Sequence, residues 1–434
     1  MPLVAWYRRN RARSAALFDL LDDEAYYSRP IALRQPVVFY EGHLPAFSFN
    51  TLVKRGLGRP PIDADLEALF ARGIDPEEMT SDTCAADGWP TRDEVKAFAA
   101  RADEQVLDAL AHADIDKPDH PLLQRSEAAL CILEHEALHQ ETLLYMWHQL
   151  PYALKRRPAG YVPRTEGVAP AHSWVHVPEG VATLGVDATS EPFTWDNERP
   201  ARVEEVPAFA IERHDVTNER YMAFVEAGGY TDQRWWRPQD WEWIQSAGIT
   251  HPMFWTHHDG QWFWRGMFEQ IALPMSWPVY VSQAEAAAFA RWQGHRLPTE
   301  AEFQRAAYGT RNGTSHRHPW GDMSPASRHG VFDFASWDPA PVGSHPDGAS
   351  AWGVEDLVGN GWEWTSTVFA PFPGFAPMPS YPEYSADFFD GKHYVMKGAS
   401  PATARELLRP SLRNWFRPRY PYVYATFRCV NGRP

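Results

Sequence analysis

Apolar residues recur at helical spacing through the first third of the chain. Positions three and four apart share one face of an α-helix, so this spacing is typical of helices that bury one side. Loops rich in Gly, Pro and Asp separate the periodic segments. The pattern predicts four helices, over Trp6 to Leu21, Pro36 to Arg55, Arg92 to Ala113 and Leu122 to Leu150. Four helices of this length favour an antiparallel bundle.

The pattern changes after residue 172. Short β-type runs, Trp174 to Val177 and Phe209 to Glu212, alternate with turns and short helices. One helix start is well marked, because Thr299 stands three residues before Glu302 in a capping-box pattern. We therefore expect an α+β protein. Its predicted parts are a helical bundle in residues 1–150, a linker in 151–172, and a domain of few strands and many ordered loops in 173–434.

Composition narrows the class of protein. A chain of 434 residues with a net charge of -15 and no block of like charge is not expected to bind nucleic acid or an anionic membrane. No apolar run approaches the length of a bilayer span, and the arginine-rich N-terminus lacks the apolar stretch of a secretory signal. A cytoplasmic protein is expected. Cys84, Cys131 and Cys429 are odd in number and far apart, which predicts neither a disulfide framework nor a thiolate metal site.

The strongest chemical signal is a histidine pair in the last predicted helix of the bundle. His135 and His139 are four residues apart, so both side chains can face one metal ion. His43, on the second predicted helix, is the best candidate for a third ligand. Three protein ligands leave half of an octahedral shell open, which an oxidase that gathers O2 and two substrates needs.

Two other interpretations of these histidines stay open. The run from His135 to His139 also matches H-E-x-x-H, the zinc metalloprotease pattern, in which Glu136 would be the general base. Nothing after His139 resembles the extended protease signature. The pair can also be two solvated histidines on a helix face, in a chain that has 18 histidines. A sugar-binding module with a structural metal is a third class to test.

The second half carries an ordered set of motifs. They are Arg296 to Phe303, His318 to Asp322, Gly353 to Leu357, Val358 to Thr365 and Phe427 to Val430. This set resembles the formylglycine-generating-enzyme and sulfatase-modifying family, which has a C-type-lectin-like fold. Those enzymes use a pair of active-site cysteines, whereas Cys429 stands alone in this region. Formylglycine generation is therefore not expected.

Together with the predicted bundle, the motifs resemble the iron sulfoxide synthases of ergothioneine and ovothiol biosynthesis. In that family a DinB-like bundle supplies three iron-binding histidines, which correspond here to His43, His135 and His139, with Glu141 following. The resemblance implies Fe(II), O2 and hercynine, the trimethylated betaine of histidine, as cofactor and substrates. Glu141 would orient a ligating histidine, although a solvated glutamate is an equal alternative.

The run Phe39 to Phe47 is similar to the selenoneine synthase branch of this family, which joins a selenosugar to hercynine. Phe369 and Phe372 stand where relatives tend to carry a catalytic tyrosine, and Leu138 stands where they often carry Gln. Phe416 replaces an acidic residue that would help bind the amine of γ-glutamylcysteine. We therefore expect a selenosugar donor. A thiol donor, γ-glutamylcysteine or cysteine, is the alternative.

The resemblance also suggests residues for substrate binding and proton transfer. Asn414 and Trp415 match the betaine-binding pair, with Trp415 offering an aromatic face to the permanent cation. Trp415 can instead be a core tryptophan. Tyr420 and Tyr422 are candidate proton donors, and both can equally be structural. The residues Asn360, Gly361 and Glu363 resemble a calcium-binding turn, so Ca(II) is a second expected metal.

Overall fold

The computed structural model describes residues 3–71 and 88–432, and Cys84 lies outside these ranges. The chain forms two compact units, which we call the bundle unit and the second unit. The bundle unit comprises Met1–Tyr161 and Met378–Pro382, and the second unit comprises Val162–Pro377 and Glu383–Pro434. The short segment Met378–Pro382 is the main departure from the predicted division, which assigned it to the second domain.

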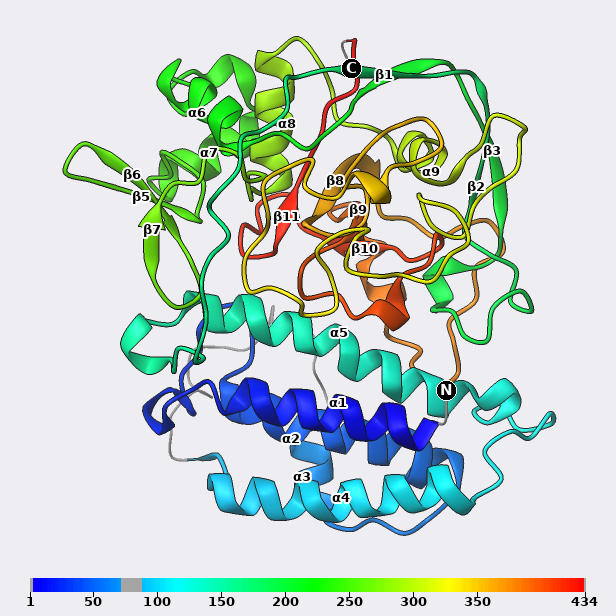
Figure 1. Ribbon diagram of the computed structural model, residues 1–434. Coiled ribbons are helices and arrows are strands. Elements are labelled where there is room, and N and C mark those ends of the chain that lie inside the picture. The colour runs from blue at the N-terminus through cyan, green and yellow to red at the C-terminus, as the bar shows by residue number, and fades with distance from the viewer. Residues whose placement is uncertain (1–2, 72–87, 433–434) are drawn as a thin grey trace. The chain divides into compact units, whose positions relative to one another are not determined.

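Long helices dominate the bundle unit (Figure 1). Their bounds are α1 Leu3–Phe18, α2 Val37–Ser48, a π-helix Phe49–Gly56, α3 Ala64–Leu69, α4 Arg92–His112 and α5 Glu127–Gln149. The four predicted helices are thus confirmed with shifted ends, whereas α3 was not predicted. Helix α2 packs on α4 and α5, and α1 packs on α5.

The helices α2 and α5 form the centre of the bundle. Every residue of α2 is buried, because its apolar residues extend around the whole helix. Helix α5 buries most of its residues, among them Leu133, Leu143 and Leu144. The outer helix α4 begins at a capping box, in which Thr91 and Glu94 satisfy each other's backbone N–H groups. None of the helices in the described ranges is long and apolar enough to cross a membrane.

The second unit contains small sheets joined by long loops (Figure 1). Its strands are β1 Trp174–Val177, β2 Gly180–Leu184, β3 Arg202–Val206, β4 Phe209–Glu212, β5 Trp255–His258, β6 Gln261–Arg265, β7 Gln270–Ala272, β8 Gly361–Val368, β9 Tyr394–Ala399, β10 Asn414–Phe416 and β11 Ala425–Thr426. The predicted strands are β1 and β4, and they pair with each other antiparallel. Strands β2 and β3 form an antiparallel pair, and β5, β6 and β7 form a meander.

The largest sheet has the order β10-β9-β8-β11, and only the β11–β8 pair is parallel. The described part of this unit also contains four α-helices: α6 Asn218–Glu226, α7 Pro238–Ser246, α8 Gln283–Trp292 and α9 Glu300–Tyr308. Helix α9 begins at the predicted capping box, formed by Thr299 and Glu302. The α+β class is confirmed.

The predicted calcium turn gains no support from the structure. The side chain of Asn360 exchanges two hydrogen bonds with the backbone of Ala340. The carboxylate of Glu363 accepts from Nε and Nη2 of the buried Arg428, at 2.6 and 2.8 Å. The oxygen atoms that calcium would require are therefore committed to protein partners.

Candidate metal centre

Three imidazoles meet inside the bundle unit. His43 comes from α2, and His135 and His139 come from one face of α5. One ring nitrogen from each residue lies within 4.8 Å of the other two. The ring centroids of His135 and His139 are 4.4 Å apart, and His43 lies 5.1 and 4.9 Å from them. The structure therefore brings together the three residues that the sequence predicted as ligands.

The protein leaves nitrogen atoms of this cluster without partners. Nδ1 of His43 lies 2.8 Å from the backbone oxygen of Phe70, so it donates a proton there and leaves Nε2 free. Nε2 of His43, both nitrogens of His135 and Nδ1 of His139 are buried without a hydrogen bond. Buried polar atoms without partners carry a free-energy cost. A metal ion coordinated by one nitrogen of each ring would remove much of that cost, and an iron(II) ion fits this set of nitrogen donors.

Gly42 allows the close packing that orients His43. A Cβ atom at Gly42 would lie 2.5 Å from the ring of Phe70. The ring of Phe70 can therefore pack on the backbone of α2 only because the residue before His43 has no side chain. The carbonyl group of the same Phe70 then reaches Nδ1 of His43.

Aromatic rings form the wall of the site. The ring of Phe47 stacks on His135 with centroids 3.5 Å apart, and Phe39 stacks on His43 at 5.0 Å. Burial lowers the pKa of His43 to about 4, against the effect of its hydrogen bond to Phe70. Burial, followed by the neighbouring histidines, lowers the pKa of His135 well below its ordinary value of 6.5. The imidazoles are therefore neutral at pH 7, as metal ligands must be.

Glu136 is committed away from the histidines. Its Oε1 accepts from Nη1 of Arg11 at 2.9 Å and from the hydroxyl of Ser14 at 2.7 Å, and both partners belong to α1. A metalloprotease would need this carboxylate to activate a water on the metal. Its contacts with α1 give it a structural role instead. Glu141 is buried on the same helix, and Leu138 is half-buried.

Tyr381 is a residue of this site that the sequence did not reveal. It belongs to the segment Met378–Pro382, which packs into the bundle unit. Its ring centroid lies 5.9 Å from that of His135 and 5.1 Å from that of Phe47. The sequence offered Tyr420 and Tyr422 as candidate proton donors, whereas the phenol that packs beside the histidines is that of Tyr381. In the sequence, the only sign of a phenol in this position was the group of tyrosines around residue 381.

Most of the predicted substrate and proton-donor residues of the second unit lie in two aromatic groups. Phe369 stacks on the half-buried Trp415 with centroids 4.3 Å apart and planes 4° apart. Phe416 stacks on Tyr420 at 5.0 Å, and Tyr420 meets Tyr422 edge to face at 4.9 Å.

Phe372 and Asn414 have local structural contacts. Phe372 is 3 % exposed, belongs to the apolar core and lies under the guanidinium of Arg413. Because the side chain is this deeply buried, the structure gives no support to the prediction that Phe372 contacts a substrate. The side-chain oxygen of Asn414 accepts from the N–H of Trp415 at 2.9 Å.

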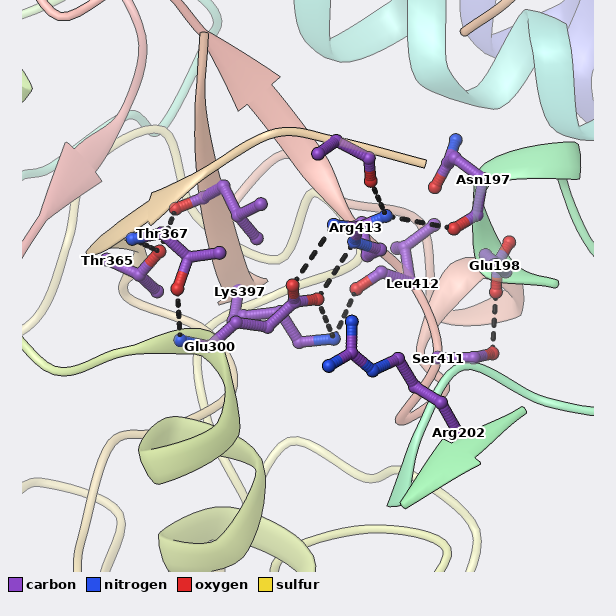
Figure 2. A network of polar contacts seen from close by, with 12 residues as sticks. Asn197, Glu198, Arg202, Glu300, Thr365, Thr367, Lys397, Ser411, Leu412 and Arg413 are labelled. Atoms are coloured by element: carbon purple, nitrogen blue, oxygen red, sulfur yellow. Dashed lines mark hydrogen bonds and ion pairs between the residues drawn. The ribbon is translucent and has the colours of Figure 1, made fainter. Parts of the chain in front are cut away.

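A buried charged network supports the strand that carries Asn414 and Trp415. Figure 2 shows Glu300 between Arg413 and Lys397. Arg413 donates to both carboxylate oxygens of Glu300, at 2.9 and 3.1 Å. Lys397 donates to the backbone oxygens of Pro410 and Leu412, both at 2.8 Å. The segment that leads into β10 is therefore held by charge-assisted hydrogen bonds.

Two known families match successive parts of the chain. The family described as sulfatase-modifying factor enzyme 1-like domain matches residues 161–433. The DinB superfamily matches residues 7–143.

Curated relatives extend over both parts. The chain is 40% identical over 352 residues to a hercynine oxygenase of Mycobacterium tuberculosis, covering 77% of each chain. It is 40% identical to a hercynine oxygenase of Mycolicibacterium thermoresistibile, covering 78% of this chain and 74% of that one. Ergothioneine biosynthesis protein 1 of Neurospora crassa is 30% identical, over 95% of this chain and 55% of its own length.

Proposed function

Since the chain belongs to the ergothioneine-type sulfoxide synthase family, we propose that it forms a carbon–chalcogen bond at imidazole C2 of hercynine in an iron- and O2-dependent reaction. The observation that carries this proposal is the cluster of His43, His135 and His139, with buried nitrogens that have no protein partner. Iron(II) held by these rings would supply open coordination positions and pass electrons from the chalcogen donor and the imidazole to O2.

Residues of each unit have separate tasks in this proposal. Phe39 and Phe47 exclude bulk water from the imidazoles by packing on their faces. The phenol of Tyr381 donates a proton to the reacting oxygen, since its ring packs beside His135. In the second unit, Trp415 offers an aromatic surface for the quaternary ammonium of hercynine, backed by Phe369.

We propose a selenosugar as the chalcogen donor. Phe369 and Phe416 carry neither charge nor hydrogen-bonding groups for the amino-acid part of γ-glutamylcysteine. Each hydrogen bond lost to a charged substrate group costs about 1.5–3 kcal/mol, or about ten- to a hundredfold in binding. A glycosyl selenolate needs only hydroxyl partners and aromatic surface. The names of the relatives favour the second candidate, a thiol donor, and the presence of Tyr381 removes one argument against it.

A competition experiment separates these possibilities. The iron-loaded chain is incubated with hercynine, O2 and equal concentrations of a glycosyl selenolate and γ-glutamylcysteine, and the products are identified by mass spectrometry. We expect the selenium adduct to dominate and O2 to be consumed with it. A dominant sulfoxide would assign the chain to the thiol-using branch. Hydrolysis of peptides by the zinc-loaded chain without O2 would overturn the proposal of an iron- and O2-dependent reaction. The matched control is His139→Ala, which should form neither product.

A further inference from the structure

The segment Met378–Pro382, which we call the strap, is held in the bundle unit through its backbone. Arg55 donates from Nη1 to the backbone oxygen of Ser380 at 3.2 Å and from Nη2 to that of Pro379 at 3.0 Å. The N–H of Ser380 donates to Oε1 of Glu127 at 3.2 Å. The backbone of Ser380 is thus held by two side chains of opposite charge. Glu127 accepts from its N–H group, and Arg55 donates to its carbonyl oxygen.

Burial accompanies these contacts. Met378 is 1% exposed and Ser380 is fully buried, so these two residues anchor the strap in the interior of its unit, while Pro379 and Pro382 are exposed. The next residue, Tyr381, then lies with its ring against Phe47 and His135.

The two charged side chains stand on the same helices as the histidines. Arg55 belongs to the π-helix that directly continues α2, which carries His43. Glu127 is the first residue of α5, which carries His135 eight residues later, about two turns along the helix. The contacts therefore tie the strap to the two elements that define the histidine cluster.

We propose that Arg55 and Glu127 are positioning residues of the histidine site. They clamp the backbone of the strap and so determine where the phenol of Tyr381 lies relative to His135. Charge-assisted hydrogen bonds to backbone atoms suit this task, because they act on the main chain directly before Tyr381. The catalytic consequence rests on the function proposed above, whereas the clamp itself does not.

Hydrogen exchange of the intact iron-loaded chain tests the clamp without turnover. Exchange is followed by mass spectrometry on the peptide that contains Ser380 and Tyr381, in the parent and in Arg55→Met and Glu127→Gln. We expect faster exchange of the strap in both variants and partial recovery in Arg55→Lys. Arg59→Met is the matched control, since Arg59 pairs with Asp108 and not with the strap. Unchanged exchange in Arg55→Met and Glu127→Gln would overturn the clamp.

A double-mutant cycle tests whether the clamp acts through Tyr381. We expect Arg55→Met to lower kcat by about 10- to 100-fold, the effect of displacing a reacting group by about an ångström. The iron content and the KM for hercynine should stay within about twofold, since the histidines are untouched. In the Tyr381→Phe background, Arg55→Met should have no further effect on kcat. If kcat of the double variant fell by the product of the two single effects, the clamp would not act through the phenol of Tyr381.

The two proposals fail in different ways. A parent chain that never turns over hercynine defeats the proposed function, and the exchange data still decide the clamp. The anaerobic nitric oxide complex of the iron-loaded chain then replaces turnover as the readout. Arg55→Met should change its electron paramagnetic resonance spectrum in the same way as Tyr381→Phe does. A parent-like spectrum in Arg55→Met beside an altered one in Tyr381→Phe would overturn the positioning role.

Discussion

The ring of Tyr381 packs against the ring of His135, with the centroids 5.9 Å apart and the planes at 68°. These two residues lie 246 positions apart in the sequence, in stretches that match different families. The phenol beside the candidate metal site is therefore supplied by a segment that the motif pattern assigns to the other domain.

Removing this phenol tests its role as a proton donor. Tyr381→Phe keeps the ring that packs on Phe47 and removes only the hydroxyl. We expect kcat to fall by about 100-fold or more, which is typical of a lost general acid, with unchanged iron content. Oxygen consumption and product formation provide the measurement. An active Tyr381→Phe beside an inactive Tyr422→Phe would return the role to Tyr422.

Substitutions at His43 and Glu136 distinguish the iron enzyme from the zinc hydrolase. His43→Ala should lose most bound iron and all O2-dependent turnover, because one of three ligands is removed. Glu136→Gln should keep the activity of the folded protein. It should also lower the free energy of unfolding by about 1–3 kcal/mol, because the half-buried Arg11 loses a charged partner. Metal analysis, turnover and denaturant unfolding are measured side by side, and the reverse pattern of activities would favour a hydrolase.

Acid should destabilise the metal-free protein through the histidine cluster. The folded chain protonates His43 only near pH 4, whereas the unfolded chain does so near 6.5, so the unfolded state binds more protons between these values. Stability should therefore fall as the pH drops from 6.5 to 4, by about 3 kcal/mol from His43 alone at 1.4 kcal/mol per pH unit. Urea unfolding of the metal-free parent and of His43→Gln at pH 7 and 5 tests this. Equal pH dependence in the two proteins would rule out the contribution of His43.

The network under β10 should matter for both stability and hercynine binding. Glu300→Gln leaves the buried Arg413 and Lys397 without their shared carboxylate, and breaking a buried ion pair costs about 3–5 kcal/mol. Because Arg413 directly precedes Asn414, we expect a raised KM for hercynine with unchanged iron content. Thermal unfolding and steady-state kinetics provide the measurements. Asp232→Asn, which breaks an exposed ion pair with Arg234, is the control and should have little effect.

The sequence by itself determined the features that depend on local geometry. Helical periodicity is enough to predict α2 and α5, and a spacing of four residues puts His135 and His139 on one face of α5 because the helical repeat imposes it. The capping box at Thr299 also follows from local hydrogen bonding. The order of the motifs in the second half was sufficient to indicate the family.

Tertiary packing decided everything that joins distant segments. The placement of His43 beside the pair depends on the packing of α2 against α5, and that of Tyr381 on the burial of the strap among bundle helices. Phe372, expected at a substrate site, fills the core beneath Arg413, and Glu136 pairs with Arg11 of α1. Such contacts arise from the shapes and charges of surfaces far apart in the chain, and a local pattern contains no information about which surfaces will meet.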